Sequence, residues 1–544
     1  MKNMHVTSKK TTHVSEDRSR SVLVIGLDGA TWELLDPWIA DGELPTFGKL
    51  IGNGVKGTLW STFPPVTPVA WTSFATGKNP GNHGIFGFRK DETIVNFQML
   101  KEERIWNLLD QEQKRSCVIQ MPLTYPPEKL NGIMVSGSLL KPPSREDFTY
   151  PPNLTEEVEE LKQLHHLYKK WYNTLGKRTK ALIFQICFDE AKCVAGIAKK
   201  LIKKEKWDFF FVLFRSTDGL QHFLWNDQRR LLEFYRALDH HMGEIISIFI
   251  EQNDGKCSNI FVVSDHGFHS SPKRIFNINA WLAKYIPNGK ERHKLEYMRN
   301  SILFRLNKLI EKTHFYLKLE KIDLFAQFAK YYKSIRERTK NQLARADRTG
   351  IFINKELFVD PKTYAYFRDF LVDKLKSLRD EEGETVLSEV YKKEEIYSGK
   401  YLEYAPDIVF LASRKYQINQ DNAVKRIFQE KNGFSLLHRP GDHFSARNGI
   451  FVSYGADIKK GIEIENAKIQ DIPATVLHIL GVRLLKNMDG RVLKEVLKES
   501  SVLYERQIRY VEEEHIPRKL EKSRSYSEKE KDEIKRKLKE LGYI

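Results

Sequence analysis

The hydrophobic positions of this 544-residue chain fall into short unbroken apolar runs and longer runs with helical spacing. The short runs, which predict buried strands, are 22–27, 116–120, 133–136, 208–214, 259–264 and 449–453. The longer runs, which predict helices, include 155–170, 177–204, 228–252 and 471–480. Strands separated by helices are typical of an α/β protein whose mostly parallel sheet is flanked by helices on both faces.

This alternation is interrupted once and is absent at both ends of the chain. Residues 1–20 are polar, and we expect a disordered N-terminal arm without a secretory signal. Segment 286–344 mixes lysines with aromatic residues and has no strand pattern, so we interpret it as a basic helical insert, or cap. The sheet domain is then expected to comprise 21–285 and 345–495. The charge pattern of 496–544 predicts an exposed, charged helical tail.

The net charge of +17 is concentrated in one part of the chain. Residues 286–348 contain 16 Lys and Arg against 7 Asp and Glu, which favours an anionic substrate or partner. Lysines among aromatic residues suit contact with nucleic acid or an anionic membrane surface, and a solvated helical face is the alternative. We find no apolar run long enough for a transmembrane segment. The four cysteines have no CxxC spacing, so we expect reduced thiols in a cytoplasmic protein.

Three of the apolar runs lead to an aspartate at or just after the end of the predicted strand. These aspartates are Asp28, Asp218 and Asp265, and His222 and His266 lie within four positions of the last two. Ligands gather at the carboxyl ends of the strands in open α/β sheets, so we expect these side chains to lie close together. Taken singly, each aspartate is more often a turn former or a helix cap. Together, carboxylates and imidazoles predict a site for a divalent metal.

A second candidate for chemistry is the segment around Thr67. Thr67 precedes Pro68 and a helix-competent run that ends at Gly77. Threonine suits the cap of a helix and proline suits its first position. We therefore expect Thr67 at a helix N-terminus, where backbone N–H groups and the helix dipole favour an anion such as phosphate. Considered alone, Thr67 is better explained as an ordinary helix cap.

Five motifs, taken in order, resemble the type I phosphodiesterase/nucleotide pyrophosphatase family of the alkaline phosphatase superfamily. They are GLDGATWELL…LPTFGKL at 26–50, FPPVTP…TGKNPGNHGI at 63–85, TDGLQHFLW at 217–225, SDHGF at 264–268 and GDHFSARNGIFVSYG at 441–455. The resemblance spans about 21–285 and 345–495. It implies an alkaline-phosphatase-like fold and metal-dependent hydrolysis of phosphoric esters.

The resemblance also implies a site that holds two metal ions. Matched position by position, the ligands of one metal are Asp28, Thr67, Asp265 and His266, and those of the other are Asp218, His222 and His443. Zinc is the favoured metal for this set, with manganese or iron as alternatives. Thr67 is then the nucleophile, which forms a phosphothreonine intermediate that water hydrolyses.

The last ligand and the substrate contacts stay open. His438 is an alternative to His443, although the Gly-Asp-His sequence around His443 matches the family better. In the family, an asparagine three residues after the nucleophile helps bind a phosphoryl oxygen, whereas this chain has Ala70 at that position. We therefore expect the backbone N–H of Thr67, the metals, or another donor such as Lys78 or Asn79 to bind that oxygen.

Two other functions remain possible from the sequence. One is a phosphate mutase or phosphotransferase on the same fold, because transfer and hydrolysis share the covalent intermediate. The other is a non-catalytic binding protein that uses the basic insert for nucleic acid or anionic membrane. The sequence leaves open whether the substrate is a nucleotide, a diester, a lipid headgroup or a sugar phosphate.

Overall fold

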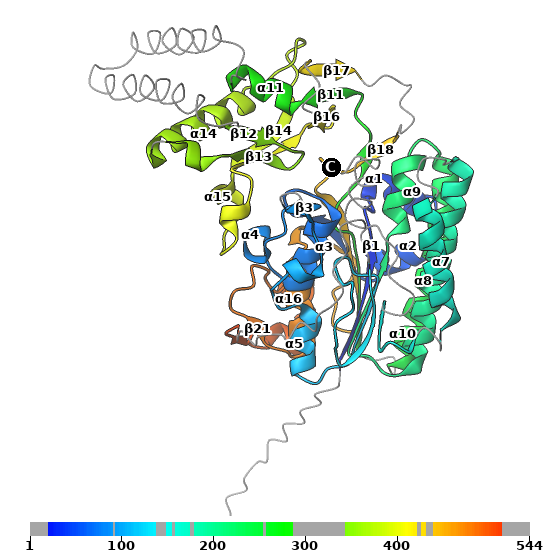
Figure 1. Cartoon of the computed structure of the whole chain (residues 1–544). Coiled ribbons are helices and arrows are strands. Elements are labelled where there is room, and N and C mark those ends of the chain that lie inside the picture. Colours follow the sequence, from blue (N-terminus) through cyan, green and yellow to red (C-terminus); the bar gives the residue numbers. More distant parts are fainter. Residues whose placement is uncertain are drawn as a thin grey trace, which may run out of the picture.

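The computed structural model places most of the chain in two connected parts, a large sheet domain and a smaller cap beside it (Figure 1). The described residues are 20–90, 93–137, 148–154, 158–173, 179–253, 257–286, 343–358, 360–420, 426–430 and 439–513. Most of the predicted N-terminal arm, the predicted insert except for its ends, and 514–544 of the predicted tail lie outside them. In the described part of the chain, no helix has the length and apolar character needed to cross a membrane.

The sheet domain is built on a nine-stranded mixed sheet with the order β20-β2-β19-β9-β1-β8-β5-β6-β7. Its strands are β1 (Ser21–Leu27), β2 (Val55–Trp60), β5 (Ser116–Ile119), β6 (Gly132–Val135), β7 (Thr149–Tyr150), β8 (Phe209–Phe214), β9 (Ser258–Val263), β19 (Asn448–Gly455) and β20 (Ile462–Lys468). The five adjacent strands β9, β1, β8, β5 and β6 are parallel to one another. Strands β19 and β7 run antiparallel to the strands beside them. The prediction of an α/β fold with a mostly parallel sheet is confirmed.

Strand β1 shows why the sheet is buried on both faces. Leu23, Ile25 and Leu27 belong to the core on one face, and Val22 and Val24 belong to the core on the other. Successive side chains of a strand point to opposite faces, so a strand covered on both sides needs an unbroken apolar run. The same argument explains why the sequence pattern located the central strands.

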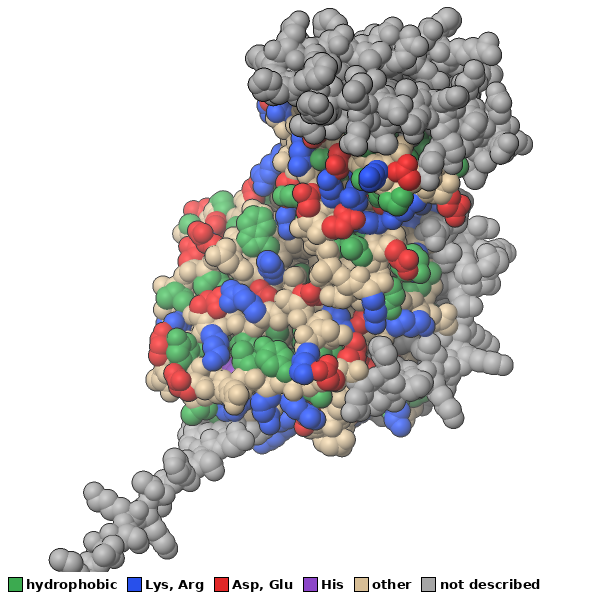
Figure 2. All heavy atoms as spheres, turned by 90° about the vertical axis from the view of Figure 1, so that its left-hand side faces the viewer, with side chains coloured by type: hydrophobic (Ala, Val, Ile, Leu, Met, Phe, Trp, Pro, Cys, Tyr) green, Lys and Arg blue, Asp and Glu red, His purple; other side chains and the backbone are tan. Residues whose placement is uncertain are grey.

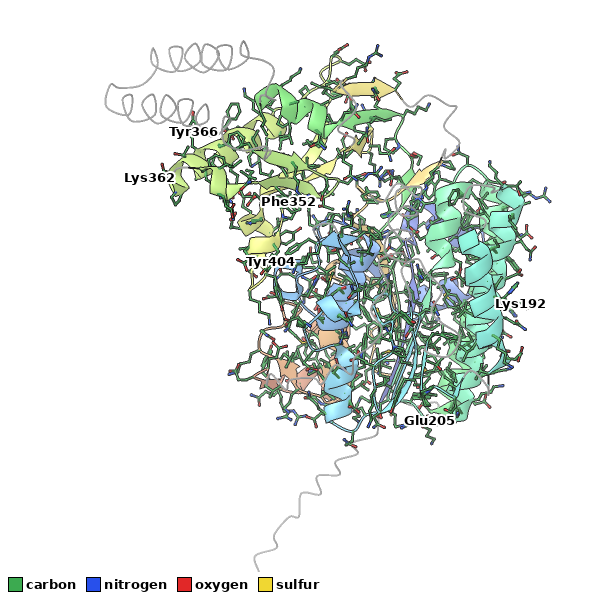
Figure 3. All side chains as sticks on the ribbon, viewed as in Figure 1. Lys192, Glu205, Phe352, Lys362, Tyr366 and Tyr404 are labelled. Atoms are coloured by element: carbon green, nitrogen blue, oxygen red, sulfur yellow. The ribbon has the colours of Figure 1, made fainter. Side chains whose placement is uncertain are left out.

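Helices cover the two faces of the sheet in two separate layers (Figure 1). The first layer comprises α1 (Trp32–Ala40), α2 (Pro45–Gly52), α7 (Glu159–Asn173), α8 (Lys180–Lys204), α9 (Ser216–Leu224) and α10 (Gln228–Gln252). The second comprises α3 (Thr67–Thr76), α5 (Ile105–Gln111) and α16 (Asp471–Ile479). The long helices are amphipathic, as Lys192 illustrates by pointing outward from α8 (Figure 3). The four helices predicted from the sequence correspond to α7, α8, α10 and α16.

The cap has a hydrophobic core of its own, formed by described residues of 274–286 and 343–430. One of its sheets has the order β12-β13-β15-β14 and the other has the order β16-β11-β17. The elements are β11 (Arg274–Asn277), α11 (Ile278–Tyr285), β12 (Ala344–Ala346), β13 (Gly350–Ile353), α14 (Pro361–Lys376), β14 (Leu387–Lys392), α15 (Lys393–Ile396), β15 (Ile408–Ala412), β16 (Tyr416–Asn419) and β17 (Phe428–Glu430). The sequence-based division gave all of 345–495 to the sheet domain, whereas the structure places a large part of it in the cap.

The described part of the predicted C-terminal tail packs on the sheet domain. Val496, Leu497 and Leu503 are buried in the core. Strand β22 (Tyr510–Val511) pairs in parallel with β21 (Leu484–Leu485). Residues 496–513 therefore form a packed segment, and the strongly charged remainder of the predicted tail lies outside the described residues.

On the face shown in Figure 2, basic and acidic side chains are interspersed.

Candidate metal centre

Three neighbouring strands bring the predicted aspartates to one edge of the sheet. Asp28 directly follows β1, and Asp265 lies two residues after β9. Asp218 lies in the first turn of α9, which begins just after β8. Strands β9, β1 and β8 are adjacent and parallel, so their carboxyl ends meet at this edge.

Helix α3 brings Thr67 to the same edge. A Cβ atom at Gly26 of β1 would lie 2.7 Å from the Trp71 ring, so glycine at this position lets α3 pack closely on the strand. Thr67 is the first residue of α3 and Val66 is its N-cap, one residue earlier than the sequence suggested. Gly77 ends the helix in the left-handed region, with φ of 67°. Thr67 therefore lies at a helix N-terminus, as predicted.

Asp28, Asp265 and His266 form a first group, with potential ligand atoms all within 4.8 Å of one another. His266 Nε2 lies 3.6 Å from Asp28 Oδ1 and 3.3 Å from Asp265 Oδ2. The Thr67 hydroxyl donates a hydrogen bond of 3.4 Å to Asp28 Oδ1. These are the four residues that the resemblance assigned to one metal.

Asp218, His266 and His443 form a second group that meets the same distance limit. Asp218 Oδ1 lies 3.5 Å from His222 Nε2 and 3.9 Å from His443 Nε2. His266 stands between the groups, because its ring stacks on His443 with 3.9 Å between the centroids. The structure thus brings together the full predicted set, which we call the metal-ligand cluster: Asp28, Thr67, Asp218, His222, Asp265, His266 and His443.

Backbone carbonyls fix the orientation of the histidines in this cluster. Each Nδ1 lies near one backbone carbonyl oxygen. His222 Nδ1 is 3.0 Å from the oxygen of Gly441, and His266 Nδ1 is 3.0 Å from that of Gly267. His443 Nδ1 is 3.1 Å from the oxygen of Pro65. A carbonyl oxygen can only accept, so Nδ1 carries the proton and Nε2 keeps its lone pair. A metal-binding histidine is usually held by such a hydrogen bond from its other ring nitrogen.

Burial controls the charges of the cluster. It raises the pKa of Asp28, and the neighbouring charge of Asp265 adds to this shift. Burial also raises the pKa of Asp265 to about 8. It lowers the pKa of His222 and His443 well below the usual value, and Arg439 adds to the shift of His222. The imidazoles of His222 and His443 are therefore neutral, and the carboxylates lie where a negative charge needs a nearby cation.

This set of donors fits a divalent metal ion. Asp265 Oδ2 and His266 Nε2 are buried and form no hydrogen bond with the described residues. Buried polar atoms are normally paired, so such atoms need an explanation, for which a bound ion is one candidate. In the part of the chain that the structure describes, neither Asp28 nor Asp265 forms an ion pair with lysine or arginine. Carboxylates and neutral imidazoles are ligands that zinc, manganese and iron accept.

Lys78, one of the two predicted substrate-binding residues, lies far from the cluster. It follows the C-terminal end of α3, about 15 Å along the helix from Thr67 at 1.5 Å per residue. Its ammonium group is completely buried and pairs with Glu102 and, at 3.0 Å, with Glu513. The geometry therefore assigns Lys78 a structural role in place of the predicted contact with substrate.

Asn79 has a structural role as well. Its side chain caps helix α4 (Pro80–His83) by accepting the N–H of Gly81 at 2.8 Å. The structure places it beside Lys78, away from the metal-ligand cluster. For the last ligand, the structure brings His443 into the cluster, and His438 lies outside the described residues.

Two residues that support the cluster were missed in the sequence. The Thr217 hydroxyl donates to the carbonyl of Asp28 at 2.6 Å, and the Gln221 amide donates to the carbonyl of Gly29 at 2.9 Å. Both come from α9 and fix the turn that follows β1. Both residues belong to the TDGLQH motif, so their positions beside Asp218 and His222 are the sequence signal that indicates them.

A comparison of the sequence with protein families gave a match over most of the chain. The matching family is described as type I phosphodiesterase / nucleotide pyrophosphatase, and the match covers residues 22–435. This confirms the resemblance seen in the motifs. A search of curated proteins found no match.

Solved structures with a similar fold have low sequence identity to this chain. Murine ectonucleotide pyrophosphatase/phosphodiesterase 5, an inactive threonine-to-alanine variant in complex with AMP, has a TM-score of 0.50 and 15% identity, covering 88% of this chain and 100% of its own. The human protein has a TM-score of 0.50 and 14% identity, with the same coverage. Phosphonoacetate hydrolase from Sinorhizobium meliloti 1021, in complex with phosphonoformate, has a TM-score of 0.51 and 13% identity, covering 85% and 96%. At these identities the likeness shows the fold alone.

Proposed function

The chain belongs to the type I phosphodiesterase/nucleotide pyrophosphatase family and is a phosphoric ester hydrolase, and we propose that the metal-ligand cluster is its active site. The observation that carries this proposal is the position of Thr67. Its hydroxyl lies at the N-terminus of α3 and donates to Asp28, within a buried group of potential metal ligands.

We propose that the cluster binds two divalent metal ions, with zinc as the favoured element. Asp28, Asp265 and His266 would hold one ion with Thr67, and Asp218, His222 and His443 would hold the other. When bound, such ions stabilise the charge on phosphoryl oxygens and lower the pKa of a coordinated hydroxyl. The protein holds the ligands in place through the carbonyls behind each imidazole and the hydrogen bond from Gly29 N–H to Asp265 at 3.0 Å.

Thr67 is the proposed nucleophile. Asp28 accepts the hydrogen bond from its hydroxyl and thereby orients the oxygen. Attack on phosphorus would give a phosphothreonine, which water would hydrolyse in a second step. The N-terminal end of α3 presents its dipole, and the N–H of Thr67, to a phosphoryl oxygen. The inactive threonine-to-alanine variant of the murine relative supports this assignment.

The substrate is proposed to be a phosphoric ester or anhydride of a nucleotide. The complex of the murine relative with AMP supports this class. The excess of Lys and Arg in the chain favours the approach of such anions.

A hydrolysis screen tests the proposal. The purified chain is incubated with bis-nitrophenyl phosphate, nitrophenyl phosphate and nucleotide pyrophosphates, with added zinc or manganese. We expect hydrolysis that a chelator removes and that either metal restores. Transfer of the phosphoryl group to a sugar phosphate in place of water would favour the phosphotransferase alternative. A folded, metal-loaded protein that hydrolyses none of these compounds would contradict the proposal.

A further inference from the structure

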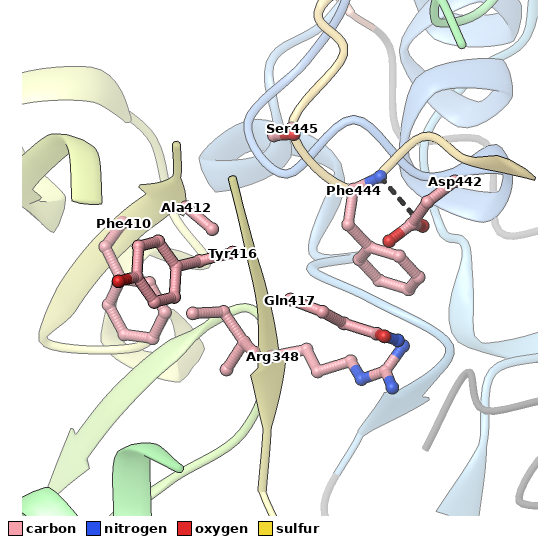
Figure 4. Close-up of a pocket in the computed structure, with 9 residues that line it drawn as sticks. Arg348, Phe410, Ala412, Tyr416, Gln417, Asp442, Phe444 and Ser445 are labelled. Carbon is pink, nitrogen blue, oxygen red and sulfur yellow. Dashed lines mark hydrogen bonds between the residues drawn. The ribbon is translucent and has the colours of Figure 1, made fainter. Parts of the chain in front are cut away.

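A small pocket lies between the cap and the segment that carries His443 (Figure 4). Its polar and aromatic lining comes from both sides: Arg348, Tyr416 and Gln417 of the cap, and Asp442, Phe444 and Ser445 of the sheet domain. The pocket is thus lined both by the cap and by the neighbours of His443 in the sequence, a residue of the metal-ligand cluster.

One wall of this pocket is continuous with the proposed active site. The Phe444 ring stacks on the His443 ring, with 5.0 Å between centroids and 14° between planes. Asp442 Oδ1 accepts the N–H of His443 at 2.8 Å and that of Phe444 at 3.4 Å. The turn that positions a potential metal ligand therefore also forms part of the pocket wall.

Arg348 supplies positive charge on the opposite wall. Its guanidinium carbon lies 4.9 Å from the centre of the Phe444 ring, toward which the side chain reaches in Figure 4. The same Phe444 ring stacks on His443, so a single aromatic ring contacts both the Arg348 guanidinium and a residue of the metal-ligand cluster.

The backbone around Arg348 is held in place by side chains of the cap. Its N–H donates to Gln420 Oε1 at 3.1 Å. The preceding residue, Asp347, accepts the N–H groups of Thr349 at 2.7 Å and Gly350 at 3.1 Å, which fixes the turn between β12 and β13. The guanidinium is thus presented from a structured hairpin.

We propose that Arg348 is a specificity-determining residue that binds a negatively charged leaving group. This inference rests on the proposed function of the metal-ligand cluster. A guanidinium forms paired hydrogen bonds with phosphate, and contact with an aromatic ring stabilises its position. The enzyme then favours phosphoric anhydrides, whose leaving group is itself a phosphate, over esters whose leaving group carries no phosphate.

The chemistry of this preference can be written for a nucleoside triphosphate. Thr67 Oγ forms a bond to the α-phosphorus, the α–β anhydride bond breaks, and pyrophosphate leaves with the electron pair. The hydroxyl proton passes to solvent. Arg348 stabilises the charge on the departing phosphate. Water then cleaves the phosphothreonine bond, which releases the nucleoside monophosphate and restores Thr67.

A matched pair of variants and a matched pair of substrates test this role. Arg348→Gln is compared with Arg345→Gln, because both remove one positive charge from the same hairpin and so change the long-range field equally. Arg345 is exposed and stacks at 4.4 Å on Phe352, which is labelled in Figure 3. The substrates are a nucleoside 5′-triphosphate and the nitrophenyl ester of the same nucleoside 5′-monophosphate, which differ only in the leaving group.

We expect Arg348→Gln to lower kcat/KM for the triphosphate about 10- to 100-fold, because the variant loses a charge-assisted contact with the leaving group. For the nitrophenyl ester, kcat/KM should fall less than about 3-fold. Arg345→Gln should change neither by more than about 3-fold, and Arg348→Lys should recover part of the loss. Thermal denaturation checks that each variant is folded. Equal loss on both substrates, or no loss on either, would overturn the role of Arg348. Absence of turnover by the wild-type enzyme on both would instead remove the proposed function.

Discussion

Two clusters of polar side chains lie at opposite ends of α3, and they differ in charge balance. At the N-terminal end, Thr67 belongs to the metal-ligand cluster, whose carboxylates and imidazoles are potential ligands. At the C-terminal end is the lysine–glutamate cluster, which we define as Lys78, Glu102, Lys400 and Glu513. In it, Lys78 pairs with Glu102 and Glu513, and Lys400 pairs with Glu102 at 2.7 Å.

The comparison separates a structural cluster from a functional one. The lysine–glutamate cluster contains two cations and two anions from four separate segments, so its charges balance without a ligand. In the metal-ligand cluster, burial raises the pKa of Asp28 and Asp265, although the charge of Arg215 acts in the opposite direction on Asp28, and neither carboxylate forms an ion pair with a described lysine or arginine. Buried charges are retained only when they are paired, so this second arrangement points to a cation from outside.

The largest effect is expected at the proposed nucleophile. Thr67→Ala should lower kcat/KM by about 10³-fold or more, because it removes the hydroxyl that is proposed to attack phosphorus. The matched control is Thr72→Ala, which removes the same atoms from the same helix, where the Thr72 hydroxyl donates to the Pro68 carbonyl at 2.6 Å. Steady-state kinetics of both variants give the comparison. Activity of Thr67→Ala within tenfold of wild type would exclude Thr67 as the nucleophile.

At the other end of the helix, the expected effect is on stability. Lys78→Met should lower the free energy of unfolding by about 3–5 kcal/mol, because it leaves buried carboxylates without their partner. Activity per folded molecule should stay unchanged. The double variant Lys78→Met with Glu102→Gln should recover part of the loss, since it removes one unpaired charge. Urea denaturation measures all three proteins, and a single variant as stable as wild type would contradict the structural role.

Metal removal should affect only the metal-ligand cluster. An excess of zinc of about 100 times Kd should stabilise the metal-free protein by about 2.7 kcal/mol. Asp265 has a pKa of about 8, so a proton competes with the metal below that pH and the stabilisation should be larger at pH 8.5 than at pH 6.5. For the metal-free protein, stability depends on pH in the opposite direction. Its folded state favours the protonated carboxyl, so its stability should fall as pH rises from about 4 toward about 8.

Differential scanning calorimetry with and without chelator measures this dependence. Lys78→Met, which leaves the cluster intact, should retain the same metal-induced shift in Tm. A shift that is independent of pH would show that the raised pKa of Asp265 does not govern metal binding.

The smallest effect is expected for Lys400→Gln. The Lys400 side chain is 44% exposed, so water and salt screen its ion pair with Glu102. The loss should be about 0–1 kcal/mol in urea denaturation. A loss as large as that of Lys78→Met would mean that the lysine–glutamate cluster acts as one unit, which exposure of Lys400 argues against.

The proximity of these seven residues could be predicted because each of them lies in a short motif at a strand end or a helix start. Parallel strands then bring those ends together, which makes a local signal sufficient. Lys78 was misplaced because the sequence gives its distance from Thr67 along the chain but no direction in space. Its partners Glu102 and Glu513 are 24 and 435 residues away, and no periodic pattern connects them.

The cap shows a second limit of the sequence. Strand β11 pairs with β16 across a separation of about 140 residues, and both strands have only four residues. Such short strands have little periodicity, and the pairing depends on tertiary packing. The insert was therefore recognised by its charge, whereas the cap that surrounds its ends was assigned to the sheet domain.

The connection between the sheet domain and the cap has an evolutionary consequence. The chain leaves through β10 (His269–Ser270) and returns through β18 (Gly441–Asp442), and these strands pair antiparallel with His269 opposite Asp442 and Ser270 opposite Gly441. Paired residues of this kind are about 5 Å apart, so a short turn could join them in place of the cap. The two connections to the cap thus lie side by side, and the cap is further held on the sheet domain by contacts such as that of Tyr397 with Phe86. A lineage that replaced the cap would change its substrates while inheriting the chemistry of the sheet unchanged.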